Sequence, residues 1–165
     1  MAGKGLFTPY KRRVFVETGT QTGSGVNCAL TSGFEEIYSI ELDKENYDRA
    51  VEAFKDNPKV HLFLGDSNTK LVEVLKLINE PVTFWLDAHS TEYSPILEEL
   101  EAIKNHHIKN HIIMIDDCRN FQHYYGKMGL FEVIKRVQQI NLNYKFQFIS
   151  ANETYPQSVL VAKVD

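Results

Sequence analysis

Acidic side chains and a histidine directly follow two apolar segments of this 165-residue sequence. Asp87 and His89 come after one segment, and the pair Asp116 and Asp117 comes after another. Carboxylate oxygens suit Mg²⁺, Ca²⁺ or Mn²⁺, and an added imidazole favours Mn²⁺ or Fe²⁺. An imidazole also titrates near neutral pH, which suits a general base. These residue types therefore indicate a cation site or a catalytic base, and for His89 a simple turn is the alternative.

A second candidate site surrounds the stretch VFVETGTQTGSG, residues 14–25. Its three glycines are Gly19, Gly23 and Gly25. This spacing differs from the G-x-G-x-x-G of a pyrophosphate loop, and no G-K-[ST] follows as in a P-loop. A carboxylate at Glu17 would repel a diphosphate but suits a ligand that carries an amino group. Glu41, at the end of the next apolar segment, is placed to accept hydrogen bonds from ribose hydroxyls. The residues thus favour a nucleoside with a cationic tail.

Alternating strand-like and helix-like segments must position these residues. The expected strands are Arg13–Gly19, Glu36–Leu42, Val60–Asp66, Val82–Ala88, His111–Asp117, Tyr144–Ser150 and Ser158–Val164. The expected helices are Ser24–Gly33, Asp43–Asn57, Ser67–Asn79, Ser94–His106 and Gly129–Ile140. Asp43 and Ser94 are the expected caps of their helices, Ser24 lies near a third cap, and Pro95 suits a first helical position. The last two strands are separated by seven residues. No helix fits there, so they should form an antiparallel hairpin.

This alternation predicts a doubly wound, Rossmann-like α/β fold with a seven-stranded, mostly parallel sheet and a C-terminal antiparallel hairpin. The length favours a single domain over residues 1–165. Each of the five parallel strands brings a carboxylate to the same edge of the sheet: Glu17, Glu41, Asp66, Asp87 and Asp116. Ligands bind at this edge in open α/β sheets. Several like charges there repel one another unless a ligand or a cation uses them.

The sequence resembles the class I S-adenosylmethionine-dependent methyltransferases over essentially its whole length. ETGTQTG (residues 17–23) is similar to the E-x-G-x-x-x-G first motif of the catechol and macrocin O-methyltransferase groups. IYSIEL, LGDS and FWLDAH are similar to later motifs of the same family. The resemblance implies the following residues for binding S-adenosyl-L-methionine: Glu17, Gly19, Thr20, Gly23, Glu41, Asp66, Ser67 and Asp87. Among them, Glu17 would lie near the amino group, Glu41 near the ribose, and Asp66 and Ser67 near the adenine.

The metal-dependent members of that family imply Asp87, Asp116 and Asp117 as ligands of Mg²⁺ or another divalent cation. Two departures from the catechol-type pattern are visible. Ser90 stands where a lysine base is found, and Asp117 stands where the metal site usually has an asparagine. Asp87 and His89 are therefore the expected catalytic residues, with His89 as the replacement base.

The expected function is S-adenosylmethionine-dependent O-methylation of a small-molecule or glycan hydroxyl, assisted by a divalent cation. The alternative is a non-catalytic S-adenosylmethionine-binding or regulatory protein of the same fold. Few residues precede the first strand, so we expect an open acceptor site, or one completed by a second subunit of a homodimer. The aromatic loop RNFQHYYG, residues 119–126, could line that site through Arg119, His123 or Tyr124.

The composition of the chain limits the binding partners and the cellular compartment that the sequence predicts. The formal net charge is -4 and the pI is about 5.9, which argues against a nucleic-acid or membrane-surface partner. Two cysteines fit neither a disulfide framework nor a zinc motif. The N-terminus lacks the apolar region of a signal peptide. These features predict a cytoplasmic protein.

Overall fold

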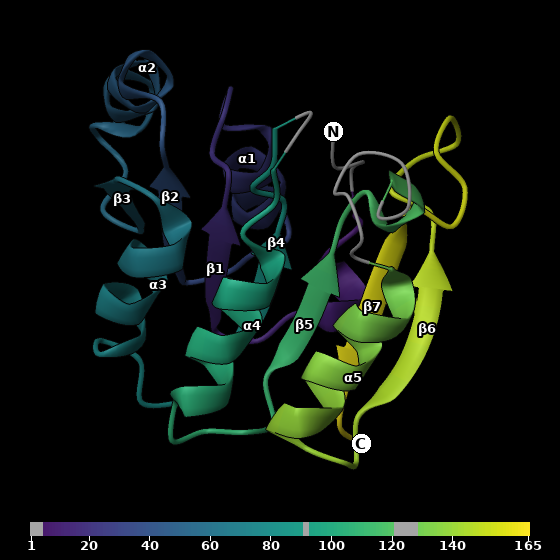
Figure 1. The fold of residues 1–165 in the computed structure, drawn as a ribbon. Helices are drawn as coiled ribbons and strands as arrows, with labels where there is room; N and C mark the ends of the chain where they lie inside the picture. Colours follow the sequence, from purple (N-terminus) through teal and green to yellow (C-terminus); the bar gives the residue numbers. More distant parts are fainter. Residues whose placement is uncertain (1–4, 91–92, 121–128) are drawn as a thin grey trace.

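The computed structural model describes residues 5–90, 93–120 and 129–165 of the chain. One sheet of seven strands crosses it in the order β3-β2-β1-β4-β5-β7-β6 (Figure 1). The strands are β1 Val14–Thr18, β2 Glu36–Glu41, β3 Val60–Leu64, β4 Thr83–Leu86, β5 Ile112–Ile115, β6 Lys145–Ile149 and β7 Val159–Lys163. The α-helices are α1 Ser24–Thr31, α2 Lys44–Phe54, α3 Ser67–Leu75, α4 Ile96–Asn105 and α5 Leu130–Ile140. Two 3₁₀-helices, η1 Thr8–Tyr10 and η2 Cys118–Asn120, complete the described elements.

The predicted strand directions are confirmed. β1 pairs in parallel with β2 and β4, β2 with β3, and β4 with β5, whereas β7 runs antiparallel to both β5 and β6. The sheet is therefore the predicted Rossmann-like α/β sheet with a C-terminal antiparallel hairpin. Its strand order reverses between β1 and β4, and the carboxyl ends of the parallel strands meet at the upper edge in Figure 1.

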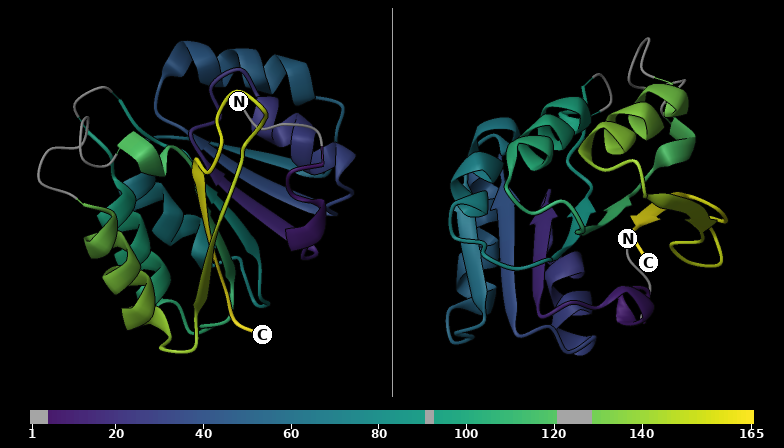
Figure 2. Two further views of the ribbon diagram at one scale, coloured as in Figure 1. Left: turned by 90° about the vertical axis from the view of Figure 1, so that its right-hand side faces the viewer. Right: turned by 90° about the horizontal axis from the view of Figure 1, so that it is seen from below.

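Helices cover both faces of the sheet, as the right-hand view of Figure 2 shows. α3, α4 and α5 pack on one face through residues such as Leu71, Leu100 and Val137. α1, α2 and η1 pack on the other through residues such as Val26 and Phe54. Burial on both faces explains why β1, β4 and β5 contain continuous apolar runs rather than an alternating pattern.

One helix start differs from the sequence expectation by one residue, and another agrees with it. α4 begins at Ile96 with Pro95 as its N-cap, and Ser94 is buried one position earlier. α1 begins at Ser24 with Gly23 as its N-cap, at a φ of 76° that favours glycine. Asp43 caps α2 as predicted, because its side chain accepts a hydrogen bond from the backbone N–H of Asn46 at 2.8 Å.

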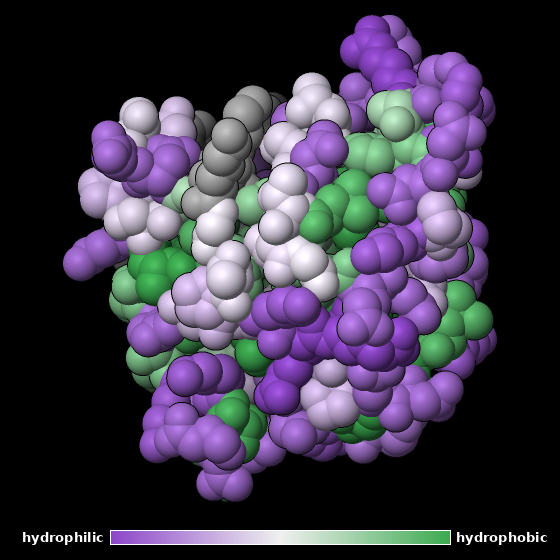
Figure 3. All heavy atoms as spheres, turned by 180° about the vertical axis from the view of Figure 1, so that it is seen from behind, coloured by the Kyte–Doolittle hydropathy of each residue, from purple (hydrophilic) through white to green (hydrophobic). Residues whose placement is uncertain are grey.

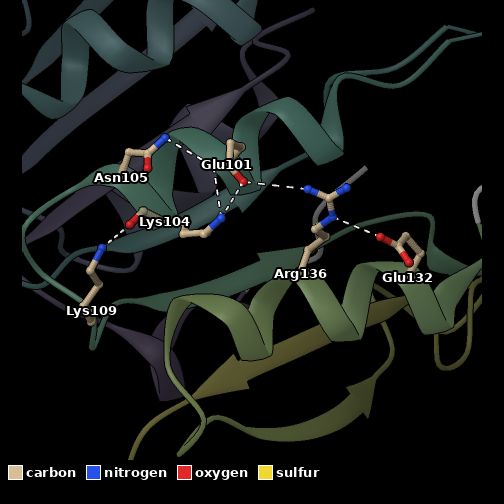
Figure 4. A network of polar contacts seen from close by, with 6 residues as sticks. All are labelled: Glu101, Lys104, Asn105, Lys109, Glu132 and Arg136. Atoms are coloured by element: carbon tan, nitrogen blue, oxygen red, sulfur yellow. Dashed lines mark hydrogen bonds and ion pairs between the residues drawn. The ribbon is translucent and has the colours of Figure 1, made fainter.

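Within the described residues, one ion pair joins α4 to α5 on the outside of the molecule, and others lie within each helix (Figure 4). Arg136 of α5 lies 3.7 Å from Glu101 of α4 and 3.0 Å from Glu132 of its own helix. Such exposed pairs each contribute less than about 1 kcal/mol, so the apolar contacts beneath them hold the two helices.

On the opposite face, hydrophilic side chains cover most of the surface and hydrophobic ones form separate patches (Figure 3). No helix in the described part of the chain combines the length and hydrophobicity that a membrane crossing requires.

A buried pair of histidines closes the amino end of the sheet. The backbone N–H of Val82 donates to His111 Nδ1 at 3.1 Å, so His111 carries its proton on Nε2. That nitrogen lies 3.1 Å from Nδ1 of His106, whose Nε2 lies 3.2 Å from the carbonyl oxygen of Ile78. The chain of hydrogen bonds is complete only when both rings are neutral. Burial lowers the pKa of His111 to about 3.

We expect this pair to make the protein less stable in mild acid. An unfolded histidine binds its proton below about pH 6.5, whereas the folded chain keeps His111 neutral until its lowered pKa is reached. The stability from neutral His111 is thus complete above pH 6.5 and declines by about 1.4 kcal/mol per pH unit as the pH falls. Urea unfolding at pH 7.5, 6.5 and 5.5 measures this slope. The raised carboxyl pKa values of Glu17, Asp87 and Glu99 act in the opposite direction in every variant, so the contribution of His111 is the difference between the slopes of the wild type and His111→Gln. His111→Gln should lower the gain in stability per pH unit, and the exposed His107→Gln should change it far less; equal slopes in all three proteins would contradict the assignment.

Candidate functional site

A cavity of about 680 Å³ opens at the carboxyl edge of the sheet, beside the reversal between β1 and β4. This is the place where open α/β sheets bind ligands. Eight of the residues singled out in the sequence line the cavity: Gly19, Glu41, Asp66, Ser67, Asp87, His89, Asp116 and Asp117. Three others do not line it: Glu17, Thr20 and Gly23. Its volume is typical of sites for small molecules and cofactors.

Gly19 brings bare backbone to the cavity wall. Its φ is 84°, and a Cβ at this position would lie only 2.8 Å from the carbonyl oxygen of Asp87. The loop after β1 can therefore pass close to the end of β4 only with glycine here. Its backbone N–H and that of Thr20 both donate to the carbonyl oxygen of Ile40, which ties the loop to β2.

Glu41 is the most firmly held carboxylate of the cavity. Its Oε2 accepts a hydrogen bond from the backbone N–H of Gln21 at 2.6 Å, and its Oε1 accepts one from Asp43 at 2.8 Å. The side chain is buried, yet it lines the cavity. Two backbone donors fix its direction and leave lone pairs for further donors such as hydroxyl groups. Leu42 beside it is 70 % exposed and offers apolar surface to a ligand.

Glu17 differs from the sequence expectation. Its side chain is 1 % exposed and points behind the loop, where Oε2 accepts a hydrogen bond from Ser39 Oγ at 2.6 Å. Oε1 lies against α1, and a Cβ on Gly25 would come within 1.7 Å of it. Burial raises the pKa of Glu17 to about 8, so the group is mostly neutral at pH 7. This placement supports an indirect role, through the shape of the loop, rather than charge attraction to an amino group.

Thr20 and Gly23 also shape the loop from behind. The hydroxyl of Thr20 lies 2.6 Å from that of Ser39, which continues the hydrogen-bond chain from Glu17. Gly23, at a φ of 76°, is packed so closely on the ring of Phe54 that a Cβ would lie 2.7 Å from it. These contacts on the side away from the cavity hold the loop together with the bond from Gln21 to Glu41 on the cavity side.

Asp66 and Ser67 stand at the start of α3. Asp66 is the N-cap of this helix, and its Oδ1 accepts a hydrogen bond from the backbone N–H of Asn68 at 3.0 Å. Ser67 is 6 % exposed but lines the cavity. The N-cap Asp66 and the first helical residue Ser67 therefore both place a polar side chain at the cavity.

Asp87, His89 and Asp117 converge on one point. Nε2 of His89 lies 3.0 Å from Oδ2 of Asp117 and 3.7 Å from Oδ1 of Asp87. One ligand atom from each of the three lies within 4.8 Å of the others, which is compact enough to hold a cation. Asp117 reaches this position at a φ of 52°, a left-handed conformation that aspartate tolerates better than most residues.

The charges of this cluster are coupled. The hydrogen bond with Asp117 raises the pKa of His89, and the same bond lowers the pKa of Asp117. The hydrogen bond therefore shifts both groups toward their charged forms. Burial raises the pKa of Asp87 to about 7, and the nearby carboxylate of Asp116 adds to the shift. Negative charge is therefore costly on Asp87 and Asp116 as they stand, and a cation or a positively charged ligand would stabilise it.

Asp116 lies apart from the convergence point. It is 8 % exposed, and its Oδ1 accepts a hydrogen bond from the backbone N–H of Asp117 at 2.8 Å. Among the residues that the structure describes, the compact group contains His89 and does not contain Asp116.

Arg119, predicted as an acceptor contact, lies with its guanidinium 5.5 Å from the ring centre of Tyr155. His123 and Tyr124, predicted for the same role, lie outside the described residues.

Sequence reasoning missed one polar residue below the cavity, Glu99 of α4. It is 1 % exposed, and the hydroxyl groups of Ser67 and Thr18 interact with its carboxyl group and oppose the rise in its pKa that burial causes. The signal was available in the helical spacing. Ile96, Leu100 and Ile103 form the buried stripe of α4, and Glu99 falls within that stripe.

No family model and no curated protein matches the sequence. Solved structures do match the fold. An O-methyltransferase from Bacillus cereus, in complex with S-adenosylhomocysteine, superposes with a TM-score of 0.71 at 14 % identity, over 97 % of this chain and 77 % of that one. TomG, an O-methyltransferase from Streptomyces achromogenes involved in tomaymycin synthesis and solved with S-adenosylmethionine, gives 0.67 at 12 % identity, over 96 % and 76 %.

Fibrillarin from Aeropyrum pernix, with natively bound S-adenosyl-L-methionine, gives a TM-score of 0.68 at 12 % identity, over 94 % of this chain and 68 % of that one. At such low identity the likeness establishes the fold alone. The chain therefore has the Rossmann-like fold of the class I S-adenosylmethionine-dependent methyltransferases, as the sequence motifs predicted.

Proposed function

We propose that this protein is an S-adenosylmethionine-dependent methyltransferase that methylates a hydroxyl oxygen of a small-molecule or glycan acceptor. The observation that carries the proposal is that Glu41 and Gly19 line the same cavity. A carboxylate held by two backbone amides is suited to accept ribose hydroxyls, and the bare backbone at Gly19 admits a ligand at close range. Both features lie at the strand-order reversal of a methyltransferase-like sheet.

The charge of the cavity supports the same ligand. Six of its lining residues carry carboxyl groups: Glu41, Asp43, Asp66, Asp87, Asp116 and Asp117. Lys44 and His89 are the cationic or titratable basic residues of the lining within the described chain. A diphosphate would be repelled here, whereas a sulfonium with an ammonium group is attracted. This argument replaces the one based on Glu17, because that side chain lies behind the loop and is mostly neutral.

His89 is the proposed base. Methyl transfer needs the acceptor oxygen in line with the methyl group that the bound S-adenosylmethionine supplies. As the new C–O bond forms and the C–S bond breaks, the acceptor proton must move to the protein. His89 is exposed enough to reach an acceptor, and Asp117 holds its ring by a 3.0 Å contact. Asp87 lies beside the pair and would orient the acceptor hydroxyl.

A divalent cation is the second part of the proposal. The donor set of two carboxylates and one imidazole fits Mn²⁺, Fe²⁺ or Mg²⁺. Asp87, Asp117 and His89 would hold the ion, with Asp116 orienting Asp117 through its backbone N–H. A bound cation would lower the pKa of the acceptor hydroxyl, so that its proton could pass to water instead of to a protein base. His89 then serves as ligand instead of base.

Calorimetric titration tests the proposed ligand. We expect S-adenosylmethionine and S-adenosylhomocysteine to bind and NAD to give no heat, because NAD brings a diphosphate to an acidic cavity. The absence of binding by both S-adenosyl compounds would refute the proposal.

A cation titration separates the two possible ligand sets. With Mn²⁺ as the probe, Asp117→Ala should weaken binding at least about tenfold, since it removes one of three ligand atoms. Asp116→Asn should bind Mn²⁺ as the wild type does, because the amide oxygen can still accept the N–H of Asp117. Equal losses in both variants would support the set Asp87, Asp116 and Asp117 that the sequence predicts.

A non-catalytic S-adenosylmethionine-binding protein is the alternative function. Ser90 favours it, because the resembling catechol-type enzymes carry a lysine base at this position. The exposed rim at His89, Ser90 and Tyr93 supports an open acceptor side, suited to a bulky acceptor or to a second subunit. Tight cofactor binding with no methyl transfer to a broad panel of hydroxylated acceptors would favour the non-catalytic protein.

A further inference from the structure

Glu99 is a buried acid that the proposed methyl transfer does not use. It is 1 % exposed within α4, between apolar neighbours of the same stripe. Among the described residues, no group hydrogen-bonds to its Oε1 atom. Burial raises the pKa of its carboxyl group to about 7. A buried polar atom of this kind is costly for folding, so its presence calls for a functional explanation.

The contacts of Glu99 all lead toward the cavity. The hydroxyl groups of Thr18, at the end of β1, and Ser67, at the start of α3, interact with its carboxyl group and oppose the effect of burial on its pKa. Thr18 Oγ1 in turn accepts a hydrogen bond from the backbone N–H of Asp87 at 3.3 Å. One side chain therefore connects α4 with the ends of β1 and β4 and with the start of α3.

A second, much smaller cavity lies between Glu99 and the main site. Its volume is about 10 Å³, close to the size of one water molecule. Asp87, His89 and Asp116 line this space together with Glu99 and also line the main cavity. Glu99 thus lies directly beneath the floor of the ligand site.

We propose that Glu99 is a positioning residue, which holds the Thr18 and Ser67 hydroxyls and thereby sets the floor of the S-adenosylmethionine site. The inference rests on the proposed function for its ligand. Thr18 carries the effect to the backbone of Asp87, and Ser67 carries it to the cavity wall. The acid is kept at this position for ligand binding, at a cost in stability.

The test compares stability with affinity in the same variants. Glu99→Leu removes the buried acid and keeps the volume, so the melting temperature should stay equal or rise. Its affinity for S-adenosylhomocysteine should fall about tenfold, because the two hydroxyls lose their common partner. Glu99→Gln keeps an acceptor oxygen and should bind within about threefold of the wild type. The same change at the exposed neighbour, Glu98→Leu, should leave the affinity unchanged. A merely structural role would lower the melting temperature of Glu99→Leu and leave the affinity intact.

Thr18→Val tests the same contact from the other side, and it keeps the proposal testable if Glu99→Leu does not fold. Thr18 is buried and does not line the cavity, yet its loss should weaken S-adenosylhomocysteine binding several-fold. Adding Glu99→Leu should then cause no more loss than Glu99→Leu alone. Wild-type affinity in both single variants would overturn the role of Glu99 only. Lack of binding by the wild type would overturn the proposed function as well.

Discussion

Glu41→Ala is expected to weaken S-adenosylhomocysteine binding at least about 100-fold, which corresponds to about 3 kcal/mol. Hydrogen bonds to a charged group contribute about 1.5–3 kcal/mol each, and the proposed ribose contacts would provide two. The substitution also releases the backbone amides of Gln21 and Asp43, which the carboxylate holds at 2.6 and 2.8 Å. The loop after β1 and the start of α2 then lose their common anchor.

Glu41→Gln separates these two effects. Its amide oxygen can accept one backbone N–H, but its NH₂ group would face the other donor. We therefore expect a loss of affinity between those of the wild type and Glu41→Ala. Glu45→Ala is the matched control, because this exposed glutamate of α2 pairs only with Arg49 in the recorded ion pairs. Calorimetry gives the affinities, and thermal unfolding checks that all three variants fold. A folded Glu41→Ala with wild-type affinity would show that the ligand does not use the end of β2.

Local patterns were sufficient to predict the order of strands and helices. Apolar runs of strand length alternate with amphipathic helical segments, and the short connection before β7 leaves room only for an antiparallel hairpin. Element ends were less predictable. Ser94 and Pro95 both suit a helix start, and the choice between them depends on packing around Ser94, which is buried. A single sequence does not contain that packing.

The strand-end carboxylates were predictable as a group, because parallel strands bring their carboxyl ends to one edge. The direction of each side chain was not. Glu17 turns away from the cavity because Ser39 of β2 donates to it and Gly25 of α1 leaves room for it. Asp116 gives way to His89 in the compact cluster because the chain turns to positive φ at Asp117. These outcomes depend on contacts between separate elements, which residue type and spacing do not specify.

Gly25→Ala is expected to cost about 3 kcal/mol of folding free energy, at the upper end of the range for overpacked cores. The new Cβ would lie 1.7 Å from Oε1 of Glu17, which cannot retreat easily because Ser39 holds its other oxygen at 2.6 Å. The cost appears despite the better helix propensity of alanine, worth about 1 kcal/mol in a helix interior. Urea unfolding measures it, and Asn27→Ala on the exposed side of α1 is the control that should not destabilise the protein.

A double-mutant cycle with Glu17→Ala shows whether the clash is the cause. Glu17→Ala alone should destabilise the protein, because it leaves a space and removes the acceptor of the Ser39 hydroxyl. Adding Gly25→Ala should then cost nothing further, since the new methyl group occupies space that the carboxyl group has left. The expected coupling energy is about 3 kcal/mol. Additive costs would mean that Glu17 and Gly25 do not depend on each other. The position of Glu17 behind the loop, and with it the charge argument for the ligand, would then need revision.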